Sequence, residues 1–252
     1  MTNPMHRFLL AALLASGSAF AQEAPKTAPA KADAPKQVAP AKAPSATAPV
    51  DRADDWWKQR QAAFNERVKQ AAEKGDAGML FIGDSITQGW EGEGKEVWEE
   101  FYAKRNAINL GIGGDRTEHV LWRLDNGNLK GLDNPKAGAA PKVAVIMIGT
   151  NNVGNTEPAD TAAGVEAMVL VLGIFPREEK PGKAREKNTK VNEIISKLAD
   201  DKSVFYMDIG ASFTETDGSL SKKIMPDFLH LSKDGYRRWA MAIESKVTEL
   251  LK

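Results

Sequence analysis

Few side chains in this chain of 252 residues can carry proton transfer or nucleophilic attack. Cysteine is absent, which excludes disulfides, thiol nucleophiles, iron–sulfur clusters and cysteine zinc sites together. The histidines are His6, His119 and His230. Because histidine is the side chain that exchanges a proton most readily near neutral pH, a histidine general base must be one of these.

His230 follows Asp227 by three residues in the segment MPDFLHLS. At that spacing the carboxylate can bind Nδ1 of the same imidazole, which fixes the tautomer and leaves Nε2 to take a proton. Asp-x-x-His is also common as a surface pair, and the spacing alone favours that simpler interpretation. His119 lies in a helical segment with no acidic residue placed to orient its other side, so we expect a structural or peripheral role for it.

Ser85 follows the apolar run 79–83 and opens a helical segment. Backbone N–H groups at a helix start can stabilise an adjacent oxyanion, although an isolated Gly-Asp-Ser is more often an ordinary serine helix cap. Asn151 follows the run 143–149 in the same way. Its amide can donate to a developing negative charge, but capping a turn is the commoner role of such an asparagine.

A glycine-rich turn, Gly111-Ile-Gly-Gly114, ends the apolar segment 107–112. It is similar to a dinucleotide-binding loop, but Arg116 occupies the third glycine position of G-x-G-x-x-G, and no Walker lysine pattern exists in the chain. Glycine here still lets a backbone N–H approach a ligand closely. By itself the segment is more often a tight turn than a binding site.

The elements that must position these residues are short apolar runs alternating with amphipathic segments. The runs predict strands at 79–83, 107–112, 143–149, 168–175 and 204–210, and the amphipathic segments predict helices at 53–74, 117–126, 191–198 and 236–250. This order predicts an α/β fold in which a parallel sheet of about five strands carries helices on both faces. Sites in such sheets form at the carboxyl ends of strands, where Ser85, Gly114 and Asn151 lie.

The connection between the third and fourth predicted strands is short, with 18 residues between Gly149 and Met168. A parallel crossover needs at least about 10–12 residues, so a helix of about two turns near 159–167 is possible. The competing interpretation continues that helix through Leu172 and removes a strand. The uninterrupted Val/Leu run favours the strand.

Four segments occur in one order at these strand ends and loops: FIGDSITQGW, NLGIGGDRT, IGTNN and DFLHLS. Together they resemble the SGNH, or GDSL, hydrolase family. Within it, GIGGDRTEHVLWRL, GIFPREEKP and DFLHL are most similar to the catalytic subunits of intracellular platelet-activating-factor acetylhydrolase and their bacterial relatives. The resemblance covers residues 78–252 and implies a three-layer, flavodoxin-like fold.

The resemblance also implies a role for each residue. Ser85 is the nucleophile, His230 the general base and Asp227 its orienting partner. The oxyanion hole consists of the backbone N–H groups of Ser85 and Gly114 and the side chain of Asn151. No metal and no organic cofactor are expected.

Two features depart from the family pattern. The short crossover described above is one, since relatives usually carry a longer helix there. The other is Asn152, which stands where the third family block often has aspartate. This change touches the neighbour of the oxyanion residue and leaves Asn151 itself intact.

The first fifty residues are expected to be a secretory signal peptide followed by a linker. Residues 1–21 have a short polar start, an apolar stretch at 8–15 and small residues before Gln22, as in a secretory signal peptide. The apolar stretch falls short of the roughly 20 residues that span a membrane. Residues 22–50 hold ten Ala and six Pro, which predicts an extended Ala/Pro/Lys-rich linker. The folded domain is therefore expected at 51–252, in a periplasmic or secreted protein.

Taken together, these features predict an exported serine esterase that removes a short acyl group, above all acetyl, from a small-molecule or carbohydrate ester. Acetyl is implied mainly by the resemblance to the acetylhydrolases, and the segments 86–106 and 211–226 agree with it because they are expected to be largely polar loops without an apolar lid. The alternative is a tethered, non-catalytic carbohydrate- or envelope-binding module, against which the filled catalytic positions argue. A net charge of zero and a pI near 6.9 give no basic surface for nucleic acid. The sequence makes no prediction of the oligomeric state.

Overall fold

A computed structural model describes residues 46, 48–132, 141–152 and 169–252. The predicted signal peptide, nearly all of the predicted linker and the expected crossover helix near 159–167 lie outside the described residues. Within the described part, no helix is both long enough and apolar enough to cross a bilayer.

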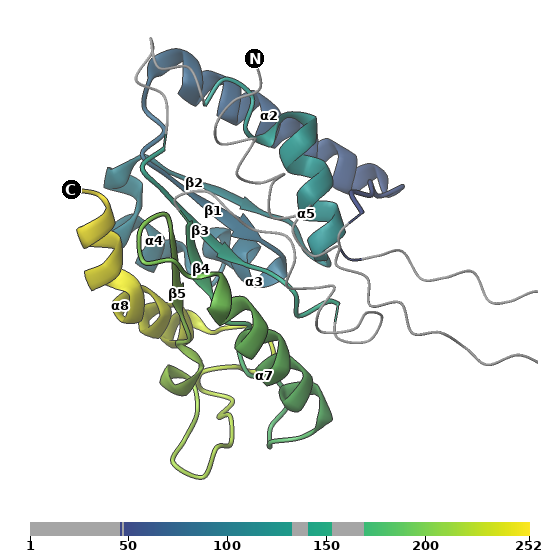
Figure 1. Cartoon of the computed structure of the whole chain (residues 1–252), viewed down its shortest axis with the longest axis vertical. Helices are drawn as coiled ribbons and strands as arrows, with labels where there is room; N and C mark the ends of the chain where they lie inside the picture. Colours follow the sequence, from purple (N-terminus) through teal and green to yellow (C-terminus); the bar gives the residue numbers. More distant parts are fainter. Residues whose placement is uncertain (1–45, 47, 133–140, 153–168) are drawn as a thin grey trace, which may run out of the picture.

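Five parallel strands form one sheet in the order β2-β1-β3-β4-β5, as the prediction of an α/β fold requires. The strands are β1 (Met79–Gly83), β2 (Ala107–Gly111), β3 (Val143–Met147), β4 (Val169–Leu172) and β5 (Val204–Met207). The chain moves outward from β1 to β2 and then returns past β1 to β3 (Figure 1). This flavodoxin-like winding makes β1 the strand at which the order reverses, where ligands bind in such sheets.

The fourth strand decides between the two interpretations of the Val/Leu run. Val169 pairs with Ala144 of β3 on one side and with Val204 of β5 on the other. The run is therefore a parallel strand, and no helix continues through Leu172. Met168 itself lies outside the described residues.

Helices cover both faces of the sheet. They are α2 (Asp55–Lys74), α3 (Ser85–Gln88), α4 (Lys95–Phe101), α5 (Thr117–Arg123), α7 (Lys183–Ile195) and α8 (Lys233–Leu250), with the short turns η1 (Gly89–Glu91), η2 (Ala103–Arg105), η3 (Leu124–Asn128), η4 (Ser196–Leu198) and η5 (Gly210–Ser212). Figure 1 shows α2 and α5 on one side of the sheet and α4 and α8 on the other. Residues 86–106, expected to be a largely polar loop, are instead mostly helical.

Alternate side chains along each strand enter two separate apolar cores, because successive residues of a strand point to opposite faces. In β1, Phe81 packs in the core that includes Trp239 of α8, whereas Leu80 packs in the core that includes Val68 of α2. All five residues of β1 are buried, as expected of a central strand covered on both sides. The two cores make the fold three layers thick.

Gly83 ends β1 at a position where no larger residue fits. A Cβ there would overlap Thr87 Oγ1 and the carbonyl oxygen of Met147. The chain can therefore turn at once from β1 into α3, with the end of β3 packed directly beside it. This close approach places Ser85 at the carboxyl edge of the sheet.

Residues before the predicted domain start at Asp51 contact α5. Ala46 is buried, and its carbonyl oxygen accepts a hydrogen bond from Thr117 Oγ1 at 2.9 Å. The backbone N–H of Val50 donates to the carbonyl oxygen of Glu118 at 3.1 Å. The last residues of the expected linker thus lie against α5, a contact that composition alone does not indicate.

Candidate active site

The structure places the sequence-predicted residues on neighbouring loops at one edge of the sheet. Ser85 follows β1, Gly114 follows β2 and Asn151 follows β3. Because β1 lies between β2 and β3, Ser85 is flanked by the other two. Asp227 and His230 lie in the segment before α8, and His230 meets the same edge through its contact with Ser85.

A series of hydrogen bonds joins Ser85, His230 and Asp227. Nε2 of His230 lies 3.0 Å from Oγ of Ser85, although the two residues are 145 positions apart in the chain. Nδ1 of His230 lies 2.6 Å from Oδ2 of Asp227. With Nδ1–H donating to the carboxylate, Nε2 is left as the acceptor that faces the serine hydroxyl.

The Asp227 carboxylate is held by its own loop. Its Oδ1 accepts the backbone N–H groups of Leu229 at 3.1 Å and His230 at 2.7 Å. Burial raises the pKa of Asp227, but the hydrogen bonds from the His230 side chain and from these N–H groups outweigh it, so that the pKa lies below its usual value. The carboxylate therefore stays ionised near neutral pH and can balance a positive imidazolium.

Gly114 lies in a loop of residues 113–116, here called the oxyanion loop. Its φ of +75° is in the left-handed region, which glycine adopts without strain. The Gly113 N–H donates to Gln88 Oε1 at 2.7 Å, whereas the N–H groups of Ser85 and Gly114 donate to no acceptor among the described residues. Those two groups are therefore available to a ligand.

Asn151 reaches the same loop from β3. One hydrogen of its side-chain amide is donated to the carbonyl oxygen of Asp115 at 2.8 Å. A primary amide carries two hydrogens, so one remains for a ligand. Asn151 is thus joined to the oxyanion loop that carries Gly114.

A buried ionic network beneath the oxyanion loop was not predicted from the sequence. The Asp115 carboxylate accepts Nε–H of Arg123 at 2.9 Å and Nε1–H of Trp57 at 2.7 Å. Arg123, which is also fully buried, donates to the carbonyl oxygens of Leu110 at 3.0 Å and Gly83 at 3.3 Å. The arginine therefore links the ends of β1 and β2 to the loop. The available sequence signal was Arg123, a charged residue next to the apolar positions Val120, Leu121 and Leu124.

The unusual Asn152 has a physical explanation in its neighbours. Its Oδ1 accepts the backbone N–H of Thr117 at 3.1 Å, and its Nδ2 donates to Oε2 of Glu118 at 3.0 Å. Glu118 is buried, with its other oxygen paired to Arg116 Nε at 2.8 Å. An aspartate at this position would bring a second carboxylate against Glu118, whereas asparagine supplies a donor.

His119 lies in the capping turn of α5, away from the bonded series at Ser85. Its Nδ1 accepts the backbone N–H of Arg116 at 3.0 Å. Asp115 Oδ1 lies 3.9 Å from the same nitrogen, which carries no hydrogen to donate to it, and Nε2 on the other side of the ring faces Arg116 Nη2. Burial lowers the pKa of His119 to about 4, and the ring is neutral near pH 7.

Asp84, to which the sequence assigned no role, precedes the serine and is fully buried. Its Oδ1 accepts the N–H of Ile86 at 2.9 Å and so caps α3. Its Oδ2 has no hydrogen-bond partner among the described residues. Burial raises the pKa of Asp84 to about 7, with the hydrogen bond from Ile86 acting in the opposite direction.

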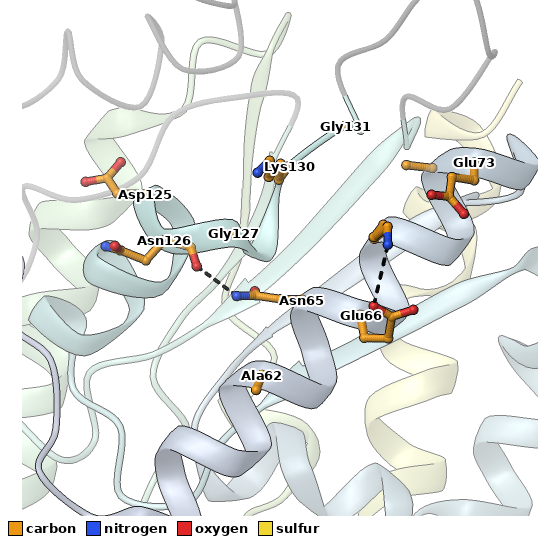
Figure 2. A pocket seen from close by; sticks show the side chains of 11 residues that line it. Ala62, Asn65, Glu66, Glu73, Asp125, Asn126, Gly127, Lys130 and Gly131 are labelled. Carbon is orange, nitrogen blue, oxygen red and sulfur yellow. Dashed lines mark hydrogen bonds and ion pairs between the residues drawn. The ribbon is translucent and has the colours of Figure 1, made fainter.

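A groove of about 1000 Å³ lies elsewhere, between α2 and the turn at residues 125–131 (Figure 2). Across it, Asn65 Nδ2 donates to the carbonyl oxygen of Asn126 at 2.9 Å. Neither Ser85 nor His230 lines this groove, so it is separate from the candidate active site. The described ranges also contain no group of three or more His, Asp or Glu side chains placed to hold a metal ion.

Comparisons with known proteins relate this chain to one family of hydrolases. Residues 81–238 match the model of the GDSL-like Lipase/Acylhydrolase family. The chain is 37% identical over 228 residues to platelet-activating factor acetylhydrolase IB subunit alpha2 of Rattus norvegicus, which covers 84% of this chain and 92% of that protein. It is 38% identical over 186 residues to the alpha1 subunit of Bos taurus, with 69% of this chain and 76% of that protein covered.

Solved structures share the fold at low sequence identity. The M. Smegmatis aryl esterase superposes with a TM-score of 0.51 and 19% identity, over 69% of this chain and 99% of that one. A GDSL-like lipase of Bacteroides thetaiotaomicron gives a TM-score of 0.51 and 17% identity, over 75% of this chain and 98% of that one. With the family match and the curated relatives, these findings show that the chain belongs to the GDSL-like lipase/acylhydrolase family and is a carboxylic ester hydrolase.

Proposed function

We propose that this protein is an exported serine esterase that removes acetyl and other short acyl groups through an acyl-enzyme on Ser85. The observation that carries the proposal is the bonded series from Ser85 through His230 to Asp227. The serine lies beside two backbone N–H groups without protein acceptors among the described residues. A nucleophile, a base, an orienting carboxylate and oxyanion donors are the parts that acyl transfer requires.

In the first step, Ser85 Oγ forms a bond to the ester carbonyl carbon while its proton passes to His230 Nε2. The carbonyl electron pair moves to oxygen, and the N–H groups of Ser85 and Gly114 and the amide of Asn151 donate to that oxyanion. Asp227 stabilises the imidazolium without itself taking the proton. The intermediate then collapses, the ester C–O bond breaks, and the leaving alcohol takes the proton from Nε2. Water repeats the sequence on the acyl-enzyme and releases the acid.

The short acyl preference is supported by where the apolar side chains near the site lie. Trp90, Val97 and Trp98 of residues 86–106 are buried in the core that includes α8. Phe213 and Met225 of residues 211–226 are buried in the same core. Side chains packed in the core cannot also line a channel for a fatty chain. The similar proteins named as acetylhydrolases support acetyl as the group removed.

An acyl-length series tests this proposal. Because each further methylene must find apolar surroundings, kcat/KM is expected to be at least about tenfold higher for p-nitrophenyl acetate than for the octanoate. Butyrate should lie between them, and acetylated xylan, sialate acetates and acetyl ether phospholipids then distinguish the alcohol portions. Ser85→Ala provides the background rate for every ester. Faster turnover of octanoate than of acetate would overturn the acetyl assignment.

Export is proposed from the polar start, apolar stretch and small residues of 1–21. A periplasmic or secreted location follows from such a signal. The full chain should be produced in a bacterial host, and the protein recovered from the cell envelope or medium should be sequenced from its amino end. The expected first residue is Gln22. Recovery of the intact amino end from the cytoplasm would contradict export.

A further inference from the structure

The segment that leads into α2 contacts the oxyanion loop and the start of α5 repeatedly. We call this segment together with the first turn of α2, residues 46 and 48–57, the strap. Its hydrogen bonds join Ala46 O to Thr117 Oγ1, Val50 N to Glu118 O, Arg52 Nη1 to Gly113 O, and Trp57 Nε1 to Asp115 Oδ1, with lengths of 2.9, 3.1, 2.8 and 2.7 Å. The strap, which is distant from the oxyanion loop in sequence, is therefore hydrogen-bonded to this loop and to the start of α5.

Within the strap, Arg52 contacts the Gly113–Gly114 peptide, whose N–H is one of the expected oxyanion donors. Its Nη1 lies 2.8 Å from Gly113 O and 3.4 Å from Asp115 Oδ1. The same nitrogen lies 3.2 Å from the position that a Cβ on Gly114 would occupy. Its Nε donates to Asp54 Oδ2 at 3.1 Å, so the guanidinium is fixed from the opposite side as well.

The carbonyl oxygen that Arg52 holds and the N–H that the oxyanion needs belong to one peptide. Gly113 C=O and Gly114 N–H are opposite ends of the same planar unit, so the direction of one sets the direction of the other. Two consecutive glycines allow that plane to rotate at little steric cost, because neither has a Cβ. The loop therefore needs an external restraint, and the arginine hydrogen bond supplies one.

The charges around Asp115 also favour a restraint by Arg52. The Asp115 carboxylate is fully buried next to the loop, and a negative charge there opposes the developing oxyanion. Arg123 pairs with one carboxylate oxygen, and Arg52 faces the other at 3.4 Å. The side chain of Arg52 is only 18% exposed, so water screens this interaction weakly.

We propose that Arg52 is a positioning residue for the oxyanion hole, which holds the Gly113–Gly114 peptide so that the Gly114 N–H points at the reacting carbonyl oxygen. Arg52 acts through that peptide and does not itself contact the substrate. This inference rests on the serine mechanism proposed above.

The test measures kcat and KM for p-nitrophenyl acetate with Arg52→Ala, Arg52→Lys and the unchanged full chain. Removing a whole oxyanion donor costs about 10²–10³-fold in kcat, which is the loss expected for Asn151→Ala. Arg52→Ala leaves the donor present but misdirected, so kcat should fall by about 10–100-fold with KM changed less than about threefold. Arg52→Lys should lose less, and added guanidinium ion should restore part of the Arg52→Ala rate.

Arg60→Ala is the matched control. Arg60 also binds a loop carbonyl, with Nε 2.9 Å from Gly111 O. The N–H of that peptide, on Ile112, already donates to Gly83 O at 3.2 Å and is not an oxyanion donor. Loss of Arg60 should therefore change kcat by less than about threefold while removing a similar arginine contact.

A boronic acid that forms a tetrahedral adduct with the serine gives a second readout. Its affinity for Arg52→Ala should fall by about the same factor as kcat/KM, because it uses the same oxyanion donors. Unchanged kcat and unchanged boronate affinity in Arg52→Ala would overturn the role, as would a loss matched by Arg60→Ala. A lower thermal unfolding midpoint of Arg52→Ala with an unchanged kcat of the folded enzyme would also overturn the role, because Arg52 would then only stabilise the fold. Those results would leave the serine mechanism intact, whereas an active Ser85→Ala would remove its basis.

Discussion

Replacing Ser85 by alanine is expected to reduce turnover of p-nitrophenyl acetate to near background, a loss on the order of 10⁶-fold. Alanine has no hydroxyl to form the acyl-enzyme. Replacing His230 by alanine should have a similar effect, because no base then remains 3.0 Å from the Ser85 hydroxyl. The double variant should lose no more than either single variant, since nucleophile and base act as one unit.

Folding must be checked alongside these rates. Neither Ser85 nor His230 is fully buried, and neither belongs to an apolar core, so both variants should keep the thermal unfolding midpoint of the parent. His119→Ala is a useful comparison, because this ring is buried and caps α5. It should affect stability more than turnover. If Ser85→Ala retains most of the parental activity, the nucleophile is misassigned.

The second large effect is expected for Asp227→Asn, with a loss of turnover that reaches about 10⁴-fold. The asparagine Oδ1 can still accept the N–H groups of Leu229 and His230, so the loop should keep its shape. Its amide nitrogen would then face Nδ1 of His230 as a donor. Nδ1 must then accept a hydrogen bond, so the imidazole adopts the tautomer that carries its hydrogen on Nε2. That nitrogen can no longer take the Ser85 proton.

Asp217→Asn is the matched control for this substitution. Asp217 also accepts a backbone N–H two residues later, that of Ser219 at 2.9 Å, in an exposed turn. Its contacts include no member of the bonded series at Ser85. Turnover measured by stopped-flow or steady-state assay should stay within about twofold of the parent there. Equal losses in both variants would show that the effect of Asp227→Asn is not specific to the imidazole tautomer.

Much of the fold follows from patterns that act over a few residues. The apolar run 79–83 is long enough for a strand and is buried on both faces, and it is correctly predicted as β1. Amphipathic spacing likewise predicts α8, and in the structure Ser232 caps this helix by accepting the Gly235 N–H on its Oγ at 3.2 Å. The short helix α4 was missed, because its seven residues show too little of a helical period.

In the candidate site, contacts between residues close in sequence differ in the same way from contacts between distant residues. The Asp227–His230 contact joins residues three apart, a spacing that allows the contact but by itself favours an ordinary surface pair. The contact of His230 with Ser85 spans 145 positions and was expected only through the family resemblance. No local pattern places two loops of the chain side by side, because that depends on the strand order.

Tertiary structure alone decided three features. The order β2-β1-β3 puts Gly114 and Asn151 on either side of Ser85. The burial of Glu118 explains why asparagine is favoured at position 152. Packing of the strap brings Arg52 to a loop 61 positions away.

These features share a physical reason. Strand and helix formation depend on backbone geometry and side-chain period, which a short stretch of sequence contains. The strength of a hydrogen bond or ion pair depends on burial and on partners that only the assembled core brings near. The sequence therefore determined which groups of this protein can do chemistry, and the packing of the two cores decided which of them meet and which hold the others in place.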